Sequence, residues 1–155
     1  MNGQKASLGR LADFPPYQLL VTSNEVSSAI ADRYRARFGL KITEWRVMAV
    51  LGDRGPTTQR ELTDVTMMDK VAVNRACKVL EDRGLVVRHP NTKDGRSHML
   101  DLTADGWEMH NEVMPFAKSI EDEIYSVLTQ AECDQLTYLL RRLFNSAESL
   151  RPTAR

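Results

Sequence analysis

Lys70, Asn74, Arg75 and Lys78 are the residues whose types and spacing best suit contact with DNA. They lie in a segment, residues 69–83, whose apolar residues recur with helical spacing, so the four side chains share one helix face. A guanidinium or a carboxamide can form two parallel hydrogen bonds with a base edge, which makes Arg75 and Asn74 candidates for reading guanine and adenine. The two ammonium groups suit phosphate contacts.

Each of these residues also has a plainer interpretation. Arg75 could instead form a surface ion pair with Glu81, Asp82 or Asp94, an interaction worth about 0–1 kcal/mol. Asn74 could be a solvated residue that contacts nothing, and the two lysines could be ordinary exposed side chains. For Arg75 we favour contact with DNA, because the expected winged-helix fold would place this helix in the major groove.

A turn-rich loop at residues 89–97 carries two more cations, Lys93 and Arg96. Arginine is favoured in a narrow minor groove because the electrostatic potential there is strongly negative, so Arg96 is the expected minor-groove residue. Lys93 is expected to contact the DNA backbone. Asp94 would be repelled by DNA, and its expected role is to orient a neighbouring arginine.

Thr58 and Gln59 lie at the expected start of a helix. Backbone N–H groups and the helix dipole favour an anion at such a position, so both residues are candidates for a phosphate contact. The alternative is that they do no more than cap the helix. The sequence leaves both interpretations open.

No catalytic or metal-binding pattern accompanies these residues. His89, His98 and His110 lack the spacing of zinc ligands, and there is no nucleophile elbow, phosphate-binding loop or paired acid–base constellation. Cys77 falls on an apolar helix stripe and is expected to be an inert core residue, whereas a redox role for Cys133 stays open. We therefore expect no enzyme activity, no cofactor and no metal.

The composition is that of a globular protein of 155 residues whose formal net charge is zero. Zero charge would argue against a nucleic-acid partner only if the charges were evenly spread. Residues 70–98 hold seven basic and three acidic residues, whereas residues 99–134 hold one basic and nine acidic residues. The block that holds the candidate DNA contacts is therefore basic. No signal peptide or membrane-spanning segment is expected, and the expected location is the cytoplasm.

Helix signals come first along the chain. A helix is expected from Tyr17 to Phe38, and Gly39 would end it. The next helix should begin at Thr43 as N-cap, with a hydrophobic staple between Ile42 and Val47, and break at residues 52–56. Thr58 and Glu61 form a capping box for a third, short helix.

The helix after that should be capped by Asp69 and end at Gly84, with an apolar stripe formed by Val73, Ala76, Cys77 and Leu80. Residues 85–88 and 98–102 are expected to be strands. A helix-turn-helix followed by a β-hairpin is a winged helix.

Two long helices complete the expected chain. Thr103 should cap the first, which contains Pro115 and should bend there, and Thr129 should cap the second. The second helix has apolar residues at alternating spacings of four and three, the pattern of a dimerisation seam. The seam residues are Leu136, Leu140, Leu143, Ala147 and Leu150.

With these motifs in this order, the chain resembles the MarR family of bacterial transcription regulators over residues 17–150. The resemblance is carried by ITEWRVM at 42–48, by VLEDRGLV at 79–86, and by the wing signature Asp-Gly-Arg at 94–96 followed by Leu-Thr at 102–103. It implies a homodimer that presents two winged helices to successive major grooves of a pseudo-palindromic operator. One departure is that Val71 and Ala72 stand where this family often has Ser or Thr.

The resemblance also implies a small, usually aromatic ligand bound between the dimerisation helices and the winged helix. Candidate ligand-binding residues are Ser23, Ser27, Tyr34, Trp45 and Arg46. Aromatic residues at helical spacing are more often plain core, and the small serines could serve close helix packing. The family's habit and the surroundings of Trp45 and Arg46 suggest an aromatic acid or its coenzyme A thioester.

The expected fold is mainly α with a small β-hairpin, in a single domain over residues 1–155. Within it, residues 1–14 are a flexible leader, 43–103 the winged helix-turn-helix, and 17–38 and 104–150 the dimerisation helices. The expected function is a sequence-specific, homodimeric repressor of transcription that binds double-stranded DNA and is released by the small aromatic ligand. The alternatives are a winged-helix protein-interaction module and a DNA-binding protein that needs no ligand.

Overall fold

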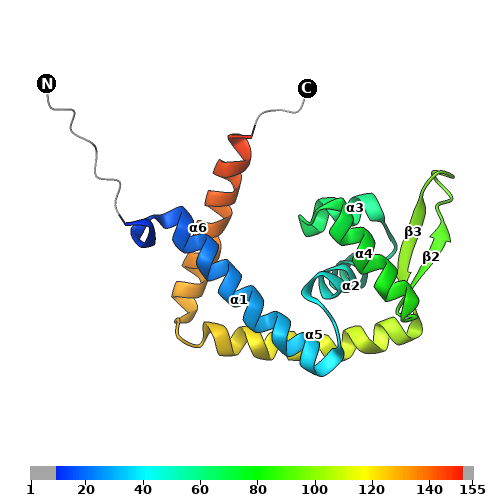
Figure 1. The fold of residues 1–155 in the computed structure, drawn as a ribbon, viewed down its shortest axis with the longest axis horizontal. Coiled ribbons are helices and arrows are strands. Elements are labelled where there is room, and N and C mark those ends of the chain that lie inside the picture. The colour runs from blue at the N-terminus through cyan, green and yellow to red at the C-terminus, as the bar shows by residue number, and fades with distance from the viewer. Residues whose placement is uncertain (1–9, 152–155) are drawn as a thin grey trace, which may run out of the picture. The chain divides into compact units, whose positions relative to one another are not determined.

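A computed structural model describes residues 10–151, and the chain divides into two compact units, residues 1–115 and 116–155. The first unit gathers α2, α3 and α4 beside a small sheet (Figure 1). The elements are a 3₁₀ turn at Leu11–Asp13, α1 (Pro15–Phe38), α2 (Ile42–Arg54), β1 (Thr57–Thr58), α3 (Gln59–Thr66), α4 (Lys70–Asp82), β2 (Val86–Pro90), β3 (His98–Leu102), α5 (Ala104–Tyr125) and α6 (Gln130–Ser149). The expected class, mainly helical with a winged helix-turn-helix, is confirmed.

Helix α1 begins two residues before the expected Tyr17, because Pro15 and Pro16 occupy its first positions. Proline suits this place, since its missing N–H would have no partner in the first turn. The helix ends at Gly39 in the left-handed conformation, with φ of 62°, as the sequence indicated. Of the expected leader, residues 1–9 lie outside the described residues.

The expected start of α2 is wrong by two residues. Lys41 is the N-cap, and its backbone N–H donates to the Glu44 carboxylate at 2.9 Å, so Thr43 lies inside the helix. Glu44 is the third residue of the helix and is buried. The helix also runs through Gly52 and ends only at Arg54, before Gly55 with φ of 78°.

Helices α3 and α4 have the expected caps. The Thr58 hydroxyl accepts a hydrogen bond from the Glu61 backbone N–H, and the Glu61 carboxylate accepts one from the Thr58 N–H. The Asp69 carboxylate likewise accepts from Ala72 N–H at 2.8 Å. The predicted apolar stripe of α4 is buried and packs with residues of α2, including Val47 and Met48.

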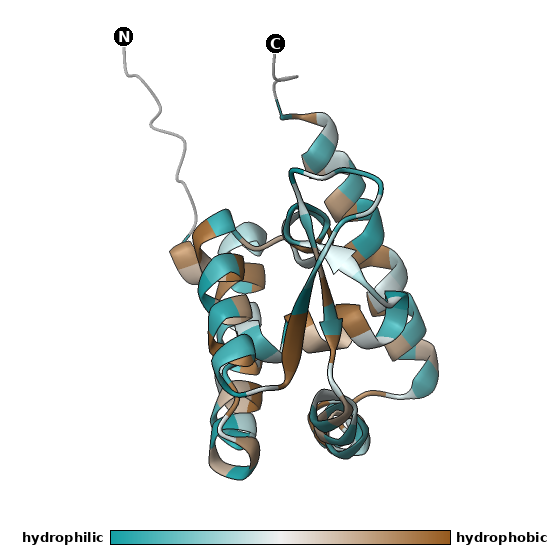
Figure 2. Ribbon diagram, turned by 90° about the vertical axis from the view of Figure 1, so that its right-hand side faces the viewer, coloured by the Kyte–Doolittle hydropathy of each residue, from teal (hydrophilic) through white to brown (hydrophobic). Residues whose placement is uncertain are grey.

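The sheet has three strands, one more than the expected hairpin. The added strand, β1, comprises Thr57 and Thr58 and pairs antiparallel with Leu100 and Met99 of β3, so the order is β1-β3-β2. Strand β2 begins one residue later than expected and extends to Pro90. Figure 2 shows the hairpin apolar near its base and hydrophilic towards its connecting loop.

Helix α5 begins directly against the base of the hairpin. The Thr103 hydroxyl donates to the Gly84 carbonyl at 2.6 Å and accepts from the Gly106 N–H at 3.0 Å. A side chain at position 106 would collide with the Leu85 carbonyl, so only glycine allows this approach. The helix continues through Pro115, and Thr129 caps α6 with the expected box.

Within residues 10–151, no helix has the length and apolar character needed to cross a membrane.

Met67, the residue in the turn between α3 and α4, has a backbone φ of 54° and is 62% exposed. A non-glycine residue in this conformation is strained by about 1–2 kcal/mol. Replacement with glycine removes this strain, but the greater conformational freedom of glycine in the unfolded state cancels part of the gain. We predict that Met67→Gly raises the free energy of unfolding by about 0.5–1 kcal/mol in urea titrations. Met68→Gly, at the half-buried neighbour, should lower the free energy of unfolding. If both variants lower it equally, the backbone at Met67 is not strained.

Candidate nucleic-acid interface

The outer face of α4 carries the four polar residues chosen from the sequence. Lys70, Asn74, Arg75 and Lys78 are all exposed, on the side opposite the buried stripe. Within residues 10–151, the side chain of Arg75 forms no hydrogen bond or ion pair, and the ion pairs considered for it are absent. Lys78 forms only a loose, exposed pair with Asp82 at 3.5 Å. The face therefore presents donors that are free to contact an anionic partner.

Two of the seven cations in the basic segment are used inside the protein. Arg83 donates to the backbone carbonyls of Phe38 and Gly39, both at 3.1 Å, and so satisfies the C-terminal end of α1. Arg88 is held by Glu81. Counting charges along the sequence cannot separate these two structural arginines from the exposed ones, because their partners lie elsewhere in the chain.

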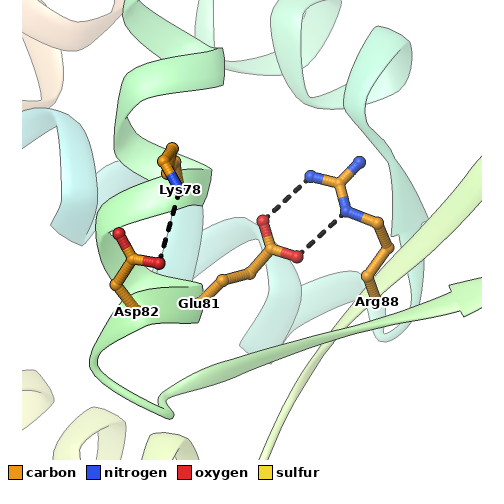
Figure 3. A network of polar contacts seen from close by, with 4 residues as sticks. All are labelled: Lys78, Glu81, Asp82 and Arg88. Atoms are coloured by element: carbon orange, nitrogen blue, oxygen red, sulfur yellow. Dashed lines mark hydrogen bonds and ion pairs between the residues drawn. The ribbon is translucent and has the colours of Figure 1, made fainter.

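Glu81 and Arg88 join the end of α4 to the first strand of the wing. Figure 3 shows the guanidinium on β2 facing the carboxylate on α4, with two hydrogen bonds of 2.9 Å each. Bonding to Arg88 holds the pKa of Glu81 below its ordinary value of 4.5, and the same contact raises the pKa of Arg88. Both side chains are partly shielded, so the pair fixes the wing against the helix more firmly than an exposed ion pair would.

The loop at the tip of the wing is organised by its own polar side chains. The Asn91 carboxamide donates to the Ser97 hydroxyl at 2.8 Å and accepts from the Lys93 backbone N–H at 3.0 Å. The Asp94 carboxylate accepts from the backbone N–H of Arg96 at 3.1 Å. Asp94 therefore holds the backbone at Arg96, while the Arg96 and Lys93 side chains are exposed with no hydrogen-bond partner in residues 10–151.

A groove of about 350 Å³ runs between the start of α3 and the wing. Predicted residues Thr58, Gln59, Asp94 and Arg96 all border it. The sequence did not single out the other residues that line it, which are Arg60, Arg88, Asn91, Ser97 and His98. For Arg60, the available signal was its position one residue after Gln59 at the start of a helix.

Thr58 has its polar groups engaged by the capping box. Its hydroxyl donates to the Glu61 carboxylate at 2.7 Å, so the donor that a phosphate would need is already taken. These bonds hold the pKa of Glu61 below its ordinary value, which keeps a negative charge at this helix end. The geometry favours the capping interpretation for Thr58, while Gln59 keeps its side chain half-buried at the groove.

A second cavity lies on another side of the winged helix, between α2, α3 and α5. It has a volume of about 490 Å³ and is lined by Ala49, Val50, Gly52, Asp53, Arg54, Val65, His110 and Met114. The His110 ring contacts both Trp45 and Trp107, at centroid distances of 5.6 and 5.4 Å. Its Nδ1 atom is buried and has no hydrogen-bond partner within residues 10–151. An unpaired buried nitrogen carries a desolvation cost that a hydrogen bond would offset.

The five predicted ligand residues differ in their surroundings. Tyr34 and Trp45 are buried and touch edge to face at 5.9 Å, and burial raises the pKa of Tyr34. Ser23 and Arg46 are exposed and Ser27 is half-buried. None of the five lines the cavity beside His110, although Trp45 contacts the His110 ring.

The dimerisation seam of α6 remains largely uncovered in one chain. Leu136 is half-buried, whereas Leu140, Leu143, Ala147 and Leu150 are exposed, Leu143 by 57% and Leu150 by 81%. Apolar side chains in such a row are typical of a surface that packs against another helix.

The two cysteines differ in their surroundings. Cys77 is buried in the α4 stripe, and burial raises its pKa to about 11, so its thiol stays protonated and inert at neutral pH. Cys133 is half-buried. The part of the chain that the structure describes holds no group of three or more side chains suited to a metal ion.

The helix-turn-helix of α3 and α4, followed by the β2–β3 wing, defines this chain as a winged-helix protein. The family model described as MarR family matches residues 38–97, which run from the last residue of α1 to the loop between β2 and β3. The winged helix of this chain thus matches the MarR family.

Known relatives agree with this assignment. The HTH-type transcriptional repressor NicR of Pseudomonas putida is 29% identical over 66% of this chain, and the match covers 65% of NicR. A MarR/EmrR family transcriptional regulator from Acinetobacter sp. ADP1 superimposes with a TM-score of 0.83 at 27% identity, over 92% of this chain and all of that one. BpsR of Bordetella bronchiseptica, whose DNA binding is regulated by 6-hydroxynicotinic acid, has a TM-score of 0.75 at 25% identity, over 84% and 98% of the two chains.

The Glu81–Arg88 pair should make stability depend on pH. Because the folded pKa of Glu81 lies below 4.5, its contribution is full above the unfolded pKa and is lost as pH falls through the folded value. We predict that Glu81→Gln lowers the free energy of unfolding by about 1 kcal/mol at pH 7, with the difference from wild type shrinking below about pH 4. Urea titrations across pH would measure it. Asp82→Asn, which removes the exposed pair with Lys78, should change stability by less than about 0.5 kcal/mol at either pH.

Proposed function

We propose that this protein is a sequence-specific DNA-binding regulator of transcription, acting as a homodimeric repressor that a small aromatic acid releases from DNA. The observation that carries the proposal is the outer face of α4, where Asn74 and Arg75 stand exposed and unpaired between two lysines. A helix of this kind fits the major groove, where amide and guanidinium groups read base edges. The wing extends the same surface with Lys93 and Arg96.

Homodimerisation is supported by the uncovered apolar residues of α6. Leu139, Leu143 and Phe144 are among its exposed side chains, and α1 also exposes Leu19 and Leu20. A second copy would remove these surfaces from water, at about 25 cal/mol for each Å² buried. A two-fold dimer would offer two α4 faces to a pseudo-palindromic operator.

Release by an aromatic acid is supported by the cavity beside His110. Its volume of about 490 Å³ suits a small aromatic molecule, Arg54 supplies a cation for a carboxylate, and the unpaired His110 Nδ1 could exchange a hydrogen bond. The similar protein BpsR responds to 6-hydroxynicotinic acid, a molecule of this class. A coenzyme A thioester could place only its aromatic part in this space.

The DNA-binding role is tested by selecting bound duplexes from a random-sequence pool. Wild type should enrich a pseudo-palindrome, and Arg75→Ala should weaken binding to it by about 1–3 kcal/mol while relaxing the preference at one base pair in each half-site. Arg96→Ala should weaken binding through the wing. Lys118→Ala removes a cation of α5 that pairs with Glu121 and Asp122, and it should bind like wild type.

If wild type enriches no duplex, the DNA-binding role fails and the protein-interaction alternative takes its place. If the Arg75→Ala and Lys118→Ala variants lose affinity equally, the losses come from general charge and the assignment of α4 as the reading helix is wrong.

The effector is tested with 6-hydroxynicotinic acid. A ligand at 100 times its dissociation constant stabilises the fold by about 2.7 kcal/mol, so we predict a higher melting temperature and weaker duplex binding in its presence. His110→Phe should keep duplex binding and lose both ligand effects, because it removes the nitrogen at the cavity. Nicotinamide, which lacks the carboxylate, is the control ligand. If no aromatic acid tried changes the affinity for the duplex, the ligand-independent alternative is favoured.

A further inference from the structure

Val71 is the apolar exception on the outer face of α4. It is 58% exposed, whereas Val73 and Ala76 in the same two turns are buried in the stripe. Asn74 and Arg75 lie three and four residues further along, so their side chains neighbour the Val71 isopropyl group on the helix surface. The helical pattern of the sequence predicts that Val71 lies on this outer face, but it predicts no contact for the residue.

Val71 is not among the buried core residues in the part of the chain that the structure describes. It is the second residue of α4 and directly follows Lys70, while the Asp69 carboxylate one position earlier caps the helix at the Ala72 N–H. The residue therefore contributes neither to the cap nor to the core. Its position at the N-terminal end of the helix is the part of a recognition helix that comes closest to base edges in a major groove.

The chemistry of the major groove limits what an isopropyl group can recognise there. The groove edges of the bases present hydrogen-bond donors and acceptors, and the one apolar group among them is the 5-methyl group of thymine. An exposed valine between cations would be held against such a surface, since Lys70 and Arg75 on either side attract the phosphates. Charge complementarity thus points to DNA rather than to an apolar protein partner.

We propose that Val71 determines specificity by packing against the 5-methyl group of a thymine in each operator half-site. The proposal rests on the DNA-binding function above and adds one base to what that function reads. Val71 and Arg75 are four residues apart, about 6 Å along the helix, which corresponds to about two base pairs. The thymine therefore lies about two base pairs from the base that Arg75 contacts.

Replacing thymine with deoxyuridine tests this contact, because it removes the methyl group and leaves every hydrogen-bonding group in place. In the duplex selected by wild type, each thymine of the half-site is replaced in turn. Burial of one methyl group is worth about 0.8 kcal/mol, so one replacement should weaken wild-type binding about fourfold per half-site. In Val71→Ala, the same replacement should change affinity by less than about 1.5-fold.

Val79→Ala is the matched control. Val79 is also an exposed valine of α4 and also lies four residues from Arg75, but it is two turns nearer the C-terminal end of the helix, farther from the N-terminal positions that approach base edges. This variant should keep the fourfold sensitivity to deoxyuridine. Circular dichroism melting curves of the two variants establish that both are folded, so that a loss of sensitivity reports on the contact alone.

Two outcomes would overturn the proposal while leaving DNA binding intact. In the first, wild type binds every deoxyuridine duplex as tightly as the thymine duplex. In the second, Val71→Ala keeps the wild-type loss at the sensitive position, which places another residue against that methyl group. Failure of wild type to select any duplex would instead overturn the proposed function and this contact together.

Discussion

The arrangement of the whole winged helix depends on the burial of one stripe of α4. Val73, Cys77 and Leu80 are fully buried, and each such side chain contributes about 1.5–3 kcal/mol relative to an exposed one. That burial sets the rotation of the helix about its own axis. A rotation of α4 that turned its polar face inward would expose this stripe to water. The burial of the stripe therefore keeps the polar side chains on the opposite face directed outward.

The wing is also attached to α4, through a contact between β2 and the C-terminal end of the helix. The Arg88 guanidinium spans from β2 to Glu81 of α4, and Leu85 precedes that strand with a backbone carbonyl pressed against Gly106 of α5. The hairpin is thus fixed at its base by both neighbouring helices. Its tip is shaped separately, by the turn in which Asn91 and Asp94 hold the backbone. A rigid base with exposed cations at the tip suits a surface that must match the spacing of two DNA grooves.

Local signals were enough to predict much of this fold. The caps at Thr58, Asp69 and Thr129 each depend on residues three positions apart, and all three form as expected. Strand β1 was missed because two residues carry no periodicity, and their pairing with β3 joins segments more than forty residues apart. The N-cap of α2 was misplaced because threonine is the better intrinsic cap, while the backbone N–H of Lys41 finds its partner in the Glu44 carboxylate.

The candidate site divides in the same way. The exposed face of α4 follows from helical spacing alone, so Lys70, Asn74 and Arg75 could be chosen from the sequence. The engagement of Arg83 with the end of α1 is a tertiary contact, and so is the convergence of His110, Trp45 and Trp107 beside a cavity. No pattern of nearby residues in the sequence predicts the contact of Arg83 with α1 or the contact between His110 and Trp45. This is why seven cations in the basic segment overstate the number available to a partner.

In the proposed function, a few exposed cations of α4 and the wing hold this protein on DNA. The most direct measurement is the affinity for a selected duplex as a function of salt concentration. If Lys70, Lys78 and Lys93 of each protomer contact phosphates, the logarithm of the association constant should fall with the logarithm of salt concentration with a slope of about −5. An affinity that stays flat between 50 and 200 mM salt, about the range in which such contacts weaken strongly, would contradict the account.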